Sequence, residues 1–160
     1  MLIKYIYIVF MGIILAVFVG VGIAAFYKGP KPPEYPVELQ YPEAGKIGYE
    51  ATPSAQRLEL QKDQDVKFKD FQKQNELYNR NVSIIATVAA IIMLVLSLSL
   101  FKQIQVIADG LLLGGVLTLS YAVVRGFSSN DDMFRFLVVS VGLIVALVLG
   151  YLKFVRATKK

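Results

Sequence analysis

The sequence predicts an all-α integral membrane protein: a four-helix bundle with an external Pro-rich extended segment and a long helix that continues into the second span. Hydrophobic residues make up 56% of the 160 residues, too many for an ordinary soluble domain. They gather into four apolar runs of about 20 residues, the length that crosses a hydrocarbon core of about 30 Å. All six prolines fall in the polar stretch between the first two runs.

The four runs are Tyr5 to Phe26, Val82 to Phe101, Ile104 to Val124 and Met133 to Phe154. Inside a bilayer they must be helices, because only a helix satisfies every backbone polar group within one segment. The first run also fits a cleaved signal peptide. Its length exceeds the 7 to 15 residues typical of a signal core, which favours a retained first helix over 1–27.

The external loop, 28–81, divides at its last proline. The prolines predict a polyproline-like extended segment over 28–52. A helix is predicted over 53–81, with Thr52 as its N-cap and Pro53 at its first position. No Gly or Pro follows before Gly110, and acid-first pairs four residues apart support the helix: Asp63/Lys67, Asp65/Lys69 and Glu76/Arg80.

We expect this helix to run into the second span as a coiled-coil-like stalk. The alternative is a helix lying flat on the lipid, which needs one wide apolar face. The sequence offers two narrow stripes instead, one of Leu58, Val66 and Leu77 and one of Leu60, Phe71 and Tyr78. We predict that Leu60, Phe71 and Tyr78 form a seam that contacts a partner chain or the Pro-rich segment.

The remaining spans, within 82–154, are joined by short connections and followed by a basic tail, 155–160. The turn at 102–103 predicts an antiparallel hairpin, and 125–132 joins the third span to the fourth. Ser129 with Asp132 fits a capping box that opens the last helix. Arg125 is expected to anchor the end of the third span, where it can pair with Asp131 or Asp132.

Small residues recur at every fourth position in three spans. Such spacing lets a neighbouring backbone approach closely. The stripes either close the bundle or face another subunit. The predicted helix-packing residues are Gly12, Ala16, Gly20, Ala24, Gly110, Gly114, Gly142, Ala146 and Gly150.

The residue types present argue against catalysis. The chain has no Cys and no His, so the commonest general base and metal ligand are missing. No phosphate-binding loop or metal motif occurs, so we expect no catalytic residue, metal or cofactor and no nucleic-acid partner. Asp109 is the only acid inside a predicted span. It is a candidate ion or proton site, although near the span end it can instead meet headgroup water, Lys102 or Lys153.

The terminal side of the predicted bundle is basic without compensating acids. The positive-inside rule therefore places both termini in the cytoplasm and 28–81 outside. We expect a non-enzymatic multi-pass protein in the lipid bilayer, a subunit or assembly factor that contacts other membrane proteins or itself through its loop. The alternative is a small homo-oligomeric transporter or channel with Asp109 near its path.

Overall fold

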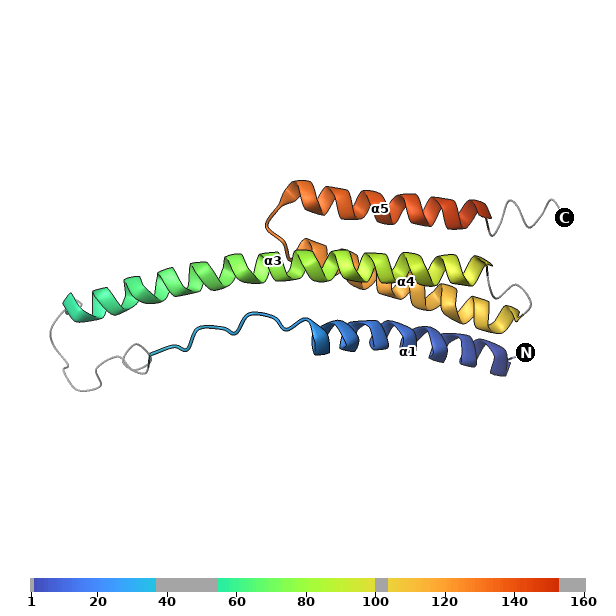
Figure 1. Ribbon diagram of the computed structural model, residues 1–160, viewed down its shortest axis with the longest axis horizontal. Helices are drawn as coiled ribbons and strands as arrows, with labels where there is room; N and C mark the ends of the chain where they lie inside the picture. Colours follow the sequence, from blue (N-terminus) through green and yellow to red (C-terminus); the bar gives the residue numbers. More distant parts are fainter. Residues whose placement is uncertain (1, 37–54, 100–103, 153–160) are drawn as a thin grey trace. The chain divides into compact units, whose positions relative to one another are not determined.

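The computed structural model describes residues 2–36, 55–99 and 104–152, and the secondary structure in these ranges is helical, without strands. The helices are α1 (Leu2–Phe26), α3 (Ala55–Ser99), α4 (Gln105–Phe127) and α5 (Asp132–Gly150), as drawn in Figure 1. Each is long and apolar enough to cross a membrane. For the described ranges, the prediction of an all-α fold with four candidate spans is confirmed.

The helix ends differ from the predicted runs by a few residues. Helix α1 begins at Leu2 rather than Tyr5, and α4 continues beyond Val124 to Phe127. Helix α5 ends at Gly150, before π-helical geometry at 151–152. Shifts of this size in both directions are expected, because helix ends fray and hydropathy locates a span better than its ends.

Helix α3 contains both the loop helix and the second span. It has 45 residues, which corresponds to a length of about 68 Å. Asp63 and Lys67 form the expected ion pair at 2.7 Å. The other two expected pairs form no ion pair, and the Arg80 guanidinium lies over the Phe134 ring instead. The predicted cap at Thr52 and Pro53 lies outside the described residues.

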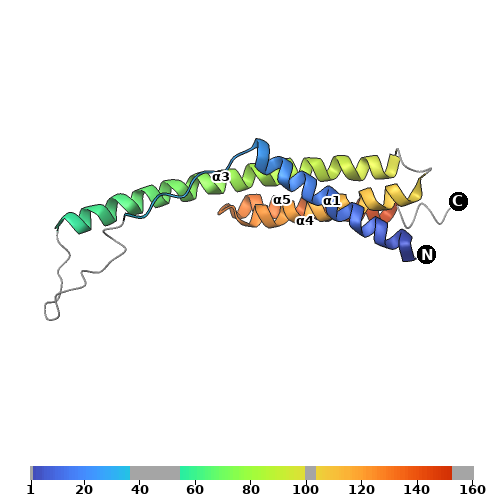
Figure 2. The same cartoon turned by 90° about the horizontal axis from the view of Figure 1, so that it is seen from below.

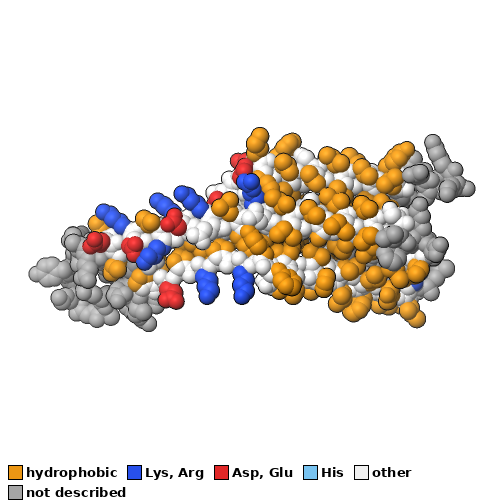
Figure 3. All heavy atoms as spheres, in the orientation of Figure 1, with side chains coloured by type: hydrophobic (Ala, Val, Ile, Leu, Met, Phe, Trp, Pro, Cys, Tyr) orange, Lys and Arg blue, Asp and Glu red, His pale blue; other side chains and the backbone are white. Residues whose placement is uncertain are grey.

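The chain divides into two compact units: Met1–Lys28 with Glu76–Lys160, called here the helical unit, and Gly29–Asn75, called the loop unit. Hydrophobic side chains cover the visible face of the four spans, whereas charged ones gather on the loop unit (Figure 3). Residues 28–36 adopt neither helix nor strand. The predicted extended segment is described only up to residue 36, and 37–52 lie outside the described residues.

Within the helical unit, α4 is the common partner of the other helices. Contacts of Met11 with Gly110 and of Leu15 with Gly114 set α1 and α4 parallel. Two hydrogen bonds, Ser83 to Ala122 and Ser97 to Ala108, hold α3 antiparallel to α4. Helix α5 returns beside α4, and the start of α1 and end of α5 lie at the same end (Figures 1 and 2).

The buried apolar cluster lies where α1, α3 and α4 meet, toward the end of the helical unit at which α1 finishes. Its fully buried members are Val82, Ala86 and Ala122, joined by Ile23. Half-buried aromatic and aliphatic side chains pack around them: Val19, Tyr27, Tyr78 and Tyr121. The small alanines let the three helices approach closely, and the tyrosines close the cluster at its polar end.

Candidate functional site

Small residues make the tightest contacts between α1 and α4. A Cβ atom on Gly114 would lie 2.9 Å from Leu15 Cβ and 3.3 Å from the Gly12 carbonyl oxygen. A Cβ on Gly12 would lie 2.8 Å from Leu113 Cγ, and one on Gly110 would lie 2.8 Å from Met11 Sδ. Each glycine therefore receives a large side chain of the facing helix, which is how small residues bring membrane helices together.

The rest of the α1 stripe leaves this contact. Ala16 is half-buried, Gly20 has no heavy atom within 4 Å of an added Cβ, and Ala24 is exposed. The reason is geometric, because four residues advance a helix by about 400°, so the stripe turns by roughly 40° at each step. By Ala24 it has turned roughly 120° away from Gly12. The structure thus brings together only the first part of the predicted stripe.

The α5 stripe makes loose contacts. A Cβ added to Gly142 would meet only Val123, at 3.7 Å, one added to Gly150 would meet nothing within 4 Å, and Ala146 is exposed.

Two unpredicted glycines are more crowded. A Cβ on Gly115 would lie 2.6 Å from a methyl carbon of Leu94 on α3, and one on Gly126 would lie 3.1 Å from Ser83 Oγ. Gly115 has Leu111 and Leu119 four residues to either side, so no small-residue repeat predicts it. Gly126 does continue the Gly110 and Gly114 series at the same spacing through Thr118 and Ala122, a signal that the predicted stripe left out.

Tyr78, predicted to contact a partner, is engaged inside the helical unit. Its ring stacks on Tyr27 with centroids 5.3 Å apart and planes 6° from parallel. Asn81 Nδ2 donates a hydrogen bond of 2.7 Å to the Tyr27 hydroxyl. Together they fasten the end of α1 to α3. Leu60 and Phe71, the other seam residues, lie in the loop unit and are half-buried.

Arg125 forms a polar clamp between α4 and α3. Its Nη1 donates a 2.8 Å hydrogen bond to Oδ1 of Asn79, a residue only 4% exposed. Its Nε donates to the Tyr121 hydroxyl at 3.0 Å. The expectation that Arg125 pairs with Asp131 or Asp132 is wrong, because Asp131 caps α5 and Asp132 pairs with Arg135. The buried amide gives the guanidinium an acceptor without burying a second charge.

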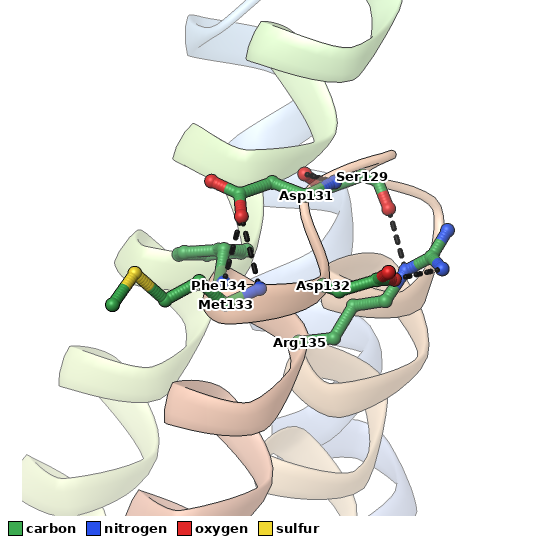
Figure 4. A network of polar contacts seen from close by, with 6 residues as sticks. All are labelled: Ser129, Asp131, Asp132, Met133, Phe134 and Arg135. Atoms are coloured by element: carbon green, nitrogen blue, oxygen red, sulfur yellow. Dashed lines mark hydrogen bonds and ion pairs between the residues drawn. The ribbon is translucent and has the colours of Figure 1, made fainter.

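The cap of α5 is Asp131, so the predicted capping box of Ser129 and Asp132 is wrong. Asp131 Oδ1 accepts hydrogen bonds from the backbone nitrogens of Met133 and Phe134 at 3.0 and 3.2 Å (Figure 4). Ser129 is buried, and its hydroxyl accepts a bond from the Asp131 nitrogen. Because the Ser129 hydroxyl is already engaged in this local turn, it does not cap α5.

Removing the Asp131 carboxylate should loosen the first turn of α5. We expect Asp131→Ala to cost about 1 kcal/mol of local stability, the usual effect of losing an N-cap. Hydrogen exchange at the Met133 and Phe134 amides would then accelerate about fivefold. Asp132→Ala is the matched control, because it removes only an exposed ion pair worth a few tenths of a kcal/mol. Equal acceleration in both variants would contradict the assignment of Asp131 as the cap.

Asp109 lies in α4 beside Gly110 and is half-buried, where it interacts with a neighbouring group. Lys102 and Lys153, its two expected neighbours, lie outside the described residues. Within 2–36, 55–99 and 104–152, no group of three acidic side chains is placed to hold a metal ion. Whether Asp109 lies near an ion path remains a hypothesis.

The loop unit carries an aromatic patch, defined here as Tyr35, Phe68 and Phe71. Phe68 and Phe71 have ring centroids 6.3 Å apart. Tyr35 and Phe68 line one groove of about 480 Å³ together with Pro32, Pro33, Gln61, Gln64 and Asp65. Gln64 Nε2 donates a 3.3 Å hydrogen bond to the Glu34 carbonyl oxygen, which ties the extended segment to α3. Only Phe71 of this patch belongs to the predicted seam.

Comparison with known proteins yields no relative from which a role can be transferred. No protein-family model matches the chain, and no curated protein or solved structure matches it either.

Proposed function

We propose that this chain is a non-enzymatic, multi-pass subunit or assembly factor of a membrane complex, and that the aromatic patch of its loop unit contacts the partner. The observation that carries the proposal is the exposure of large apolar rings on a polar, charged segment. Tyr35 is 63% exposed and Phe68 is 52% exposed. Aromatic side chains are enriched in the cores of protein interfaces and among the residues that dominate binding energy.

The patch suits recognition because its two sides are already connected. The hydrogen bond from Gln64 to Glu34 holds the prolines beside the helix before any partner arrives. Proline has little conformational freedom to lose, so ordering this surface on binding costs little entropy. A partner gains contact with the rings and with the amide groups of Gln61 and Gln64 at the groove wall.

The transporter alternative gains less support from the described spans. A path across the midplane needs polar groups that can meet an ion or a polar substrate. Most of the Ser and Thr hydroxyl groups in the described spans donate to helix carbonyl oxygens instead. These bonds run from Thr87 to Ser83, Ser97 to Ala108, Thr118 to Gly114, Ser120 to Val116 and Ser140 to Phe136. Their donor capacity is therefore already used.

Co-purification from gently solubilised membranes tests the proposal. We expect the tagged full-length chain to retain a partner in constant stoichiometry, and Phe68→Ser to reduce that partner at least tenfold, the effect of losing a contact of about 1.4 kcal/mol or more. Val66→Ser is the control, since Val66 is also apolar and 58% exposed but does not line the groove. No partner at constant stoichiometry, or equal losses from both variants, would contradict the proposal.

We also propose that both termini face the cytoplasm and that 28–81 lies outside, which would place the aromatic patch before an external or lumenal partner. The unopposed basic residues of the terminal side support this orientation. A cysteine introduced at Ser54 should react with a membrane-impermeant maleimide in intact cells, whereas one at Thr158 should react only after permeabilisation. The chain has no cysteine of its own, so the background is clean. The opposite pattern would reverse the orientation.

A further inference from the structure

The groove of the loop unit combines three kinds of chemical group. Its walls carry proline and aromatic rings, two side-chain amides and one carboxylate. The residues that line it are Pro32, Pro33, Tyr35, Gln61, Gln64, Asp65 and Phe68. All of them belong to the loop unit, so the groove is formed within one compact part of the chain. Each kind of group restricts the chemistry of what binds there.

We propose that the partner inserts an extended, proline-rich segment carrying a lysine or arginine, an inference that rests on the proposed function because it describes what the aromatic patch binds. Proline-rich peptides dock in aromatic-lined grooves of several unrelated domains. Tyr35 and Phe68 supply two exposed aromatic rings at this groove. A proline-rich segment is also extended before it binds, so it loses little conformational freedom on binding.

Helix α3 already holds a segment of this kind from its own chain. Four of the eight residues 29–36 are proline, and Gln64 Nε2 donates a hydrogen bond to the Glu34 carbonyl oxygen in this segment. Proline has no backbone N–H, and the carbonyl oxygens of a polyproline helix make no hydrogen bonds within the helix. A surface that binds such a segment must therefore donate hydrogen bonds. Gln61 lies one turn before Gln64 and lines the groove, where its amide can donate to a carbonyl oxygen of the partner.

Other peptide conformations suit these groups less well. An α-helix uses its backbone carbonyl oxygens internally except in the last turn, so it offers few acceptors to the two amides. A β-strand binds by adding to a sheet edge, and the described part of the loop unit contains no strand. The extended proline-rich form keeps its carbonyl oxygens available along its whole length.

The carboxylate of Asp65 selects a basic residue in the partner. Asp65 is exposed and lines the groove. It lies three residues before Phe68, on the same face of α3. A lysine or arginine that pairs with Asp65 therefore also meets an aromatic face, which attracts cations. The ion pair and the cation–π contact together should favour a basic peptide over its acidic counterpart about fivefold.

Fluorescence anisotropy of labelled peptides, titrated with the full chain in phosphatidylcholine nanodiscs, tests the inference. The first peptide has nine prolines around a central arginine, the second has glutamate in place of the arginine, and the third has alanines in place of the prolines. We expect the first peptide to bind about fivefold more tightly than the second and at least about tenfold more tightly than the third. Empty nanodiscs give the background from lipid.

Two pairs of variants locate the binding. Phe68→Ser should weaken binding of the arginine peptide at least about tenfold, whereas Val66→Ser, at an exposed residue outside the groove, should bind as the wild type does. Asp65→Asn keeps the shape of the side chain and should bring the arginine and glutamate peptides within about twofold of each other. Asp70→Asn is its control, because Asp70 is an exposed acid of α3 that does not line the groove.

Equal binding of the proline and alanine peptides, or of the arginine and glutamate peptides, by the wild-type chain would overturn the proposal. A dimer that Phe68→Ser abolishes, without saturable binding of any peptide, would place a second copy in the groove and overturn it too. The proposed function is tested separately. A partner that co-purifies in a Phe68-dependent manner, when no proline peptide binds, refutes the proline-rich segment and keeps the proposed function. The expected peptide binding without any co-purifying partner supports the preference of the groove and contradicts the proposed function.

Discussion

Replacing Gly114 by leucine is expected to lower the free energy of unfolding by about 3 kcal/mol, the upper end of the usual range for overpacking. The atoms that the new side chain meets are the cause. They include Leu15 Cβ, at 2.9 Å from the Cβ position, and the Gly12 carbonyl oxygen, at 3.3 Å. Neither is the far end of a flexible side chain, so α1 and α4 must move apart.

Gly20→Leu is the matched control, because it makes the same change in a span where an added Cβ meets nothing within 4 Å. Both variants gain the same helix propensity and the same apolar surface, so their difference isolates packing. Unfolding of the purified protein by increasing dodecyl sulfate, followed by circular dichroism, gives the comparison. Equal loss of stability, or none in Gly114→Leu, would contradict the packing of α1 against α4.

The number and approximate position of the spans could be predicted because a bilayer imposes a length and a composition on each one separately. The long α3 helix was predictable for a similar reason, since its sequence has no residue that breaks a helix between Pro53 and Gly110. Such properties depend on residues close together in the chain. A single sequence contains enough information to read them.

The pairing of the helices could not be predicted in the same way. Gly12 and Gly20 belong to one repeat in the sequence, yet only Gly12 is crowded, because the direction of α4 decides how far the stripe follows the contact. Gly115 belongs to no repeat, yet among the described glycines its added Cβ would lie closest to a neighbouring side chain, 2.6 Å from Leu94. Small residues indicate that close contacts exist, whereas their partners depend on packing between segments far apart in sequence.

The partner of Arg125 shows the same limit for polar groups. Sequence distance suggested the nearby aspartates, but the amide that accepts its hydrogen bond is 46 residues away in the chain. The aspartates are used locally, one to cap α5 and one to pair with Arg135 three residues later. Because both aspartates make interactions with residues close to them in the sequence, Arg125 bonds to a residue of another helix and joins the two helices.

Replacing Asn79 by leucine should therefore destabilise the helical unit by about 2 kcal/mol, because the Arg125 guanidinium loses the acceptor that the buried Asn79 amide supplies. Asn79 is 4% exposed, and the hydrogen bond from Arg125 Nη1 to its Oδ1 is 2.8 Å long. Gln74→Leu is the control, since Gln74 is an exposed amide on the same helix. The same dodecyl sulfate titration applies, and the control should change stability by less than about 0.5 kcal/mol.

The double variant Asn79→Leu, Arg125→Met distinguishes a lost hydrogen bond from poor packing of the leucine. Removing the charge as well should recover at least about 1 kcal/mol, because no polar group is then left without its partner. The two single effects must then add to more than the effect of the double variant. If the two single effects simply sum to the effect of the double variant, Arg125 is stabilised by Tyr121 and solvent alone. The clamp between α3 and α4 then does not exist.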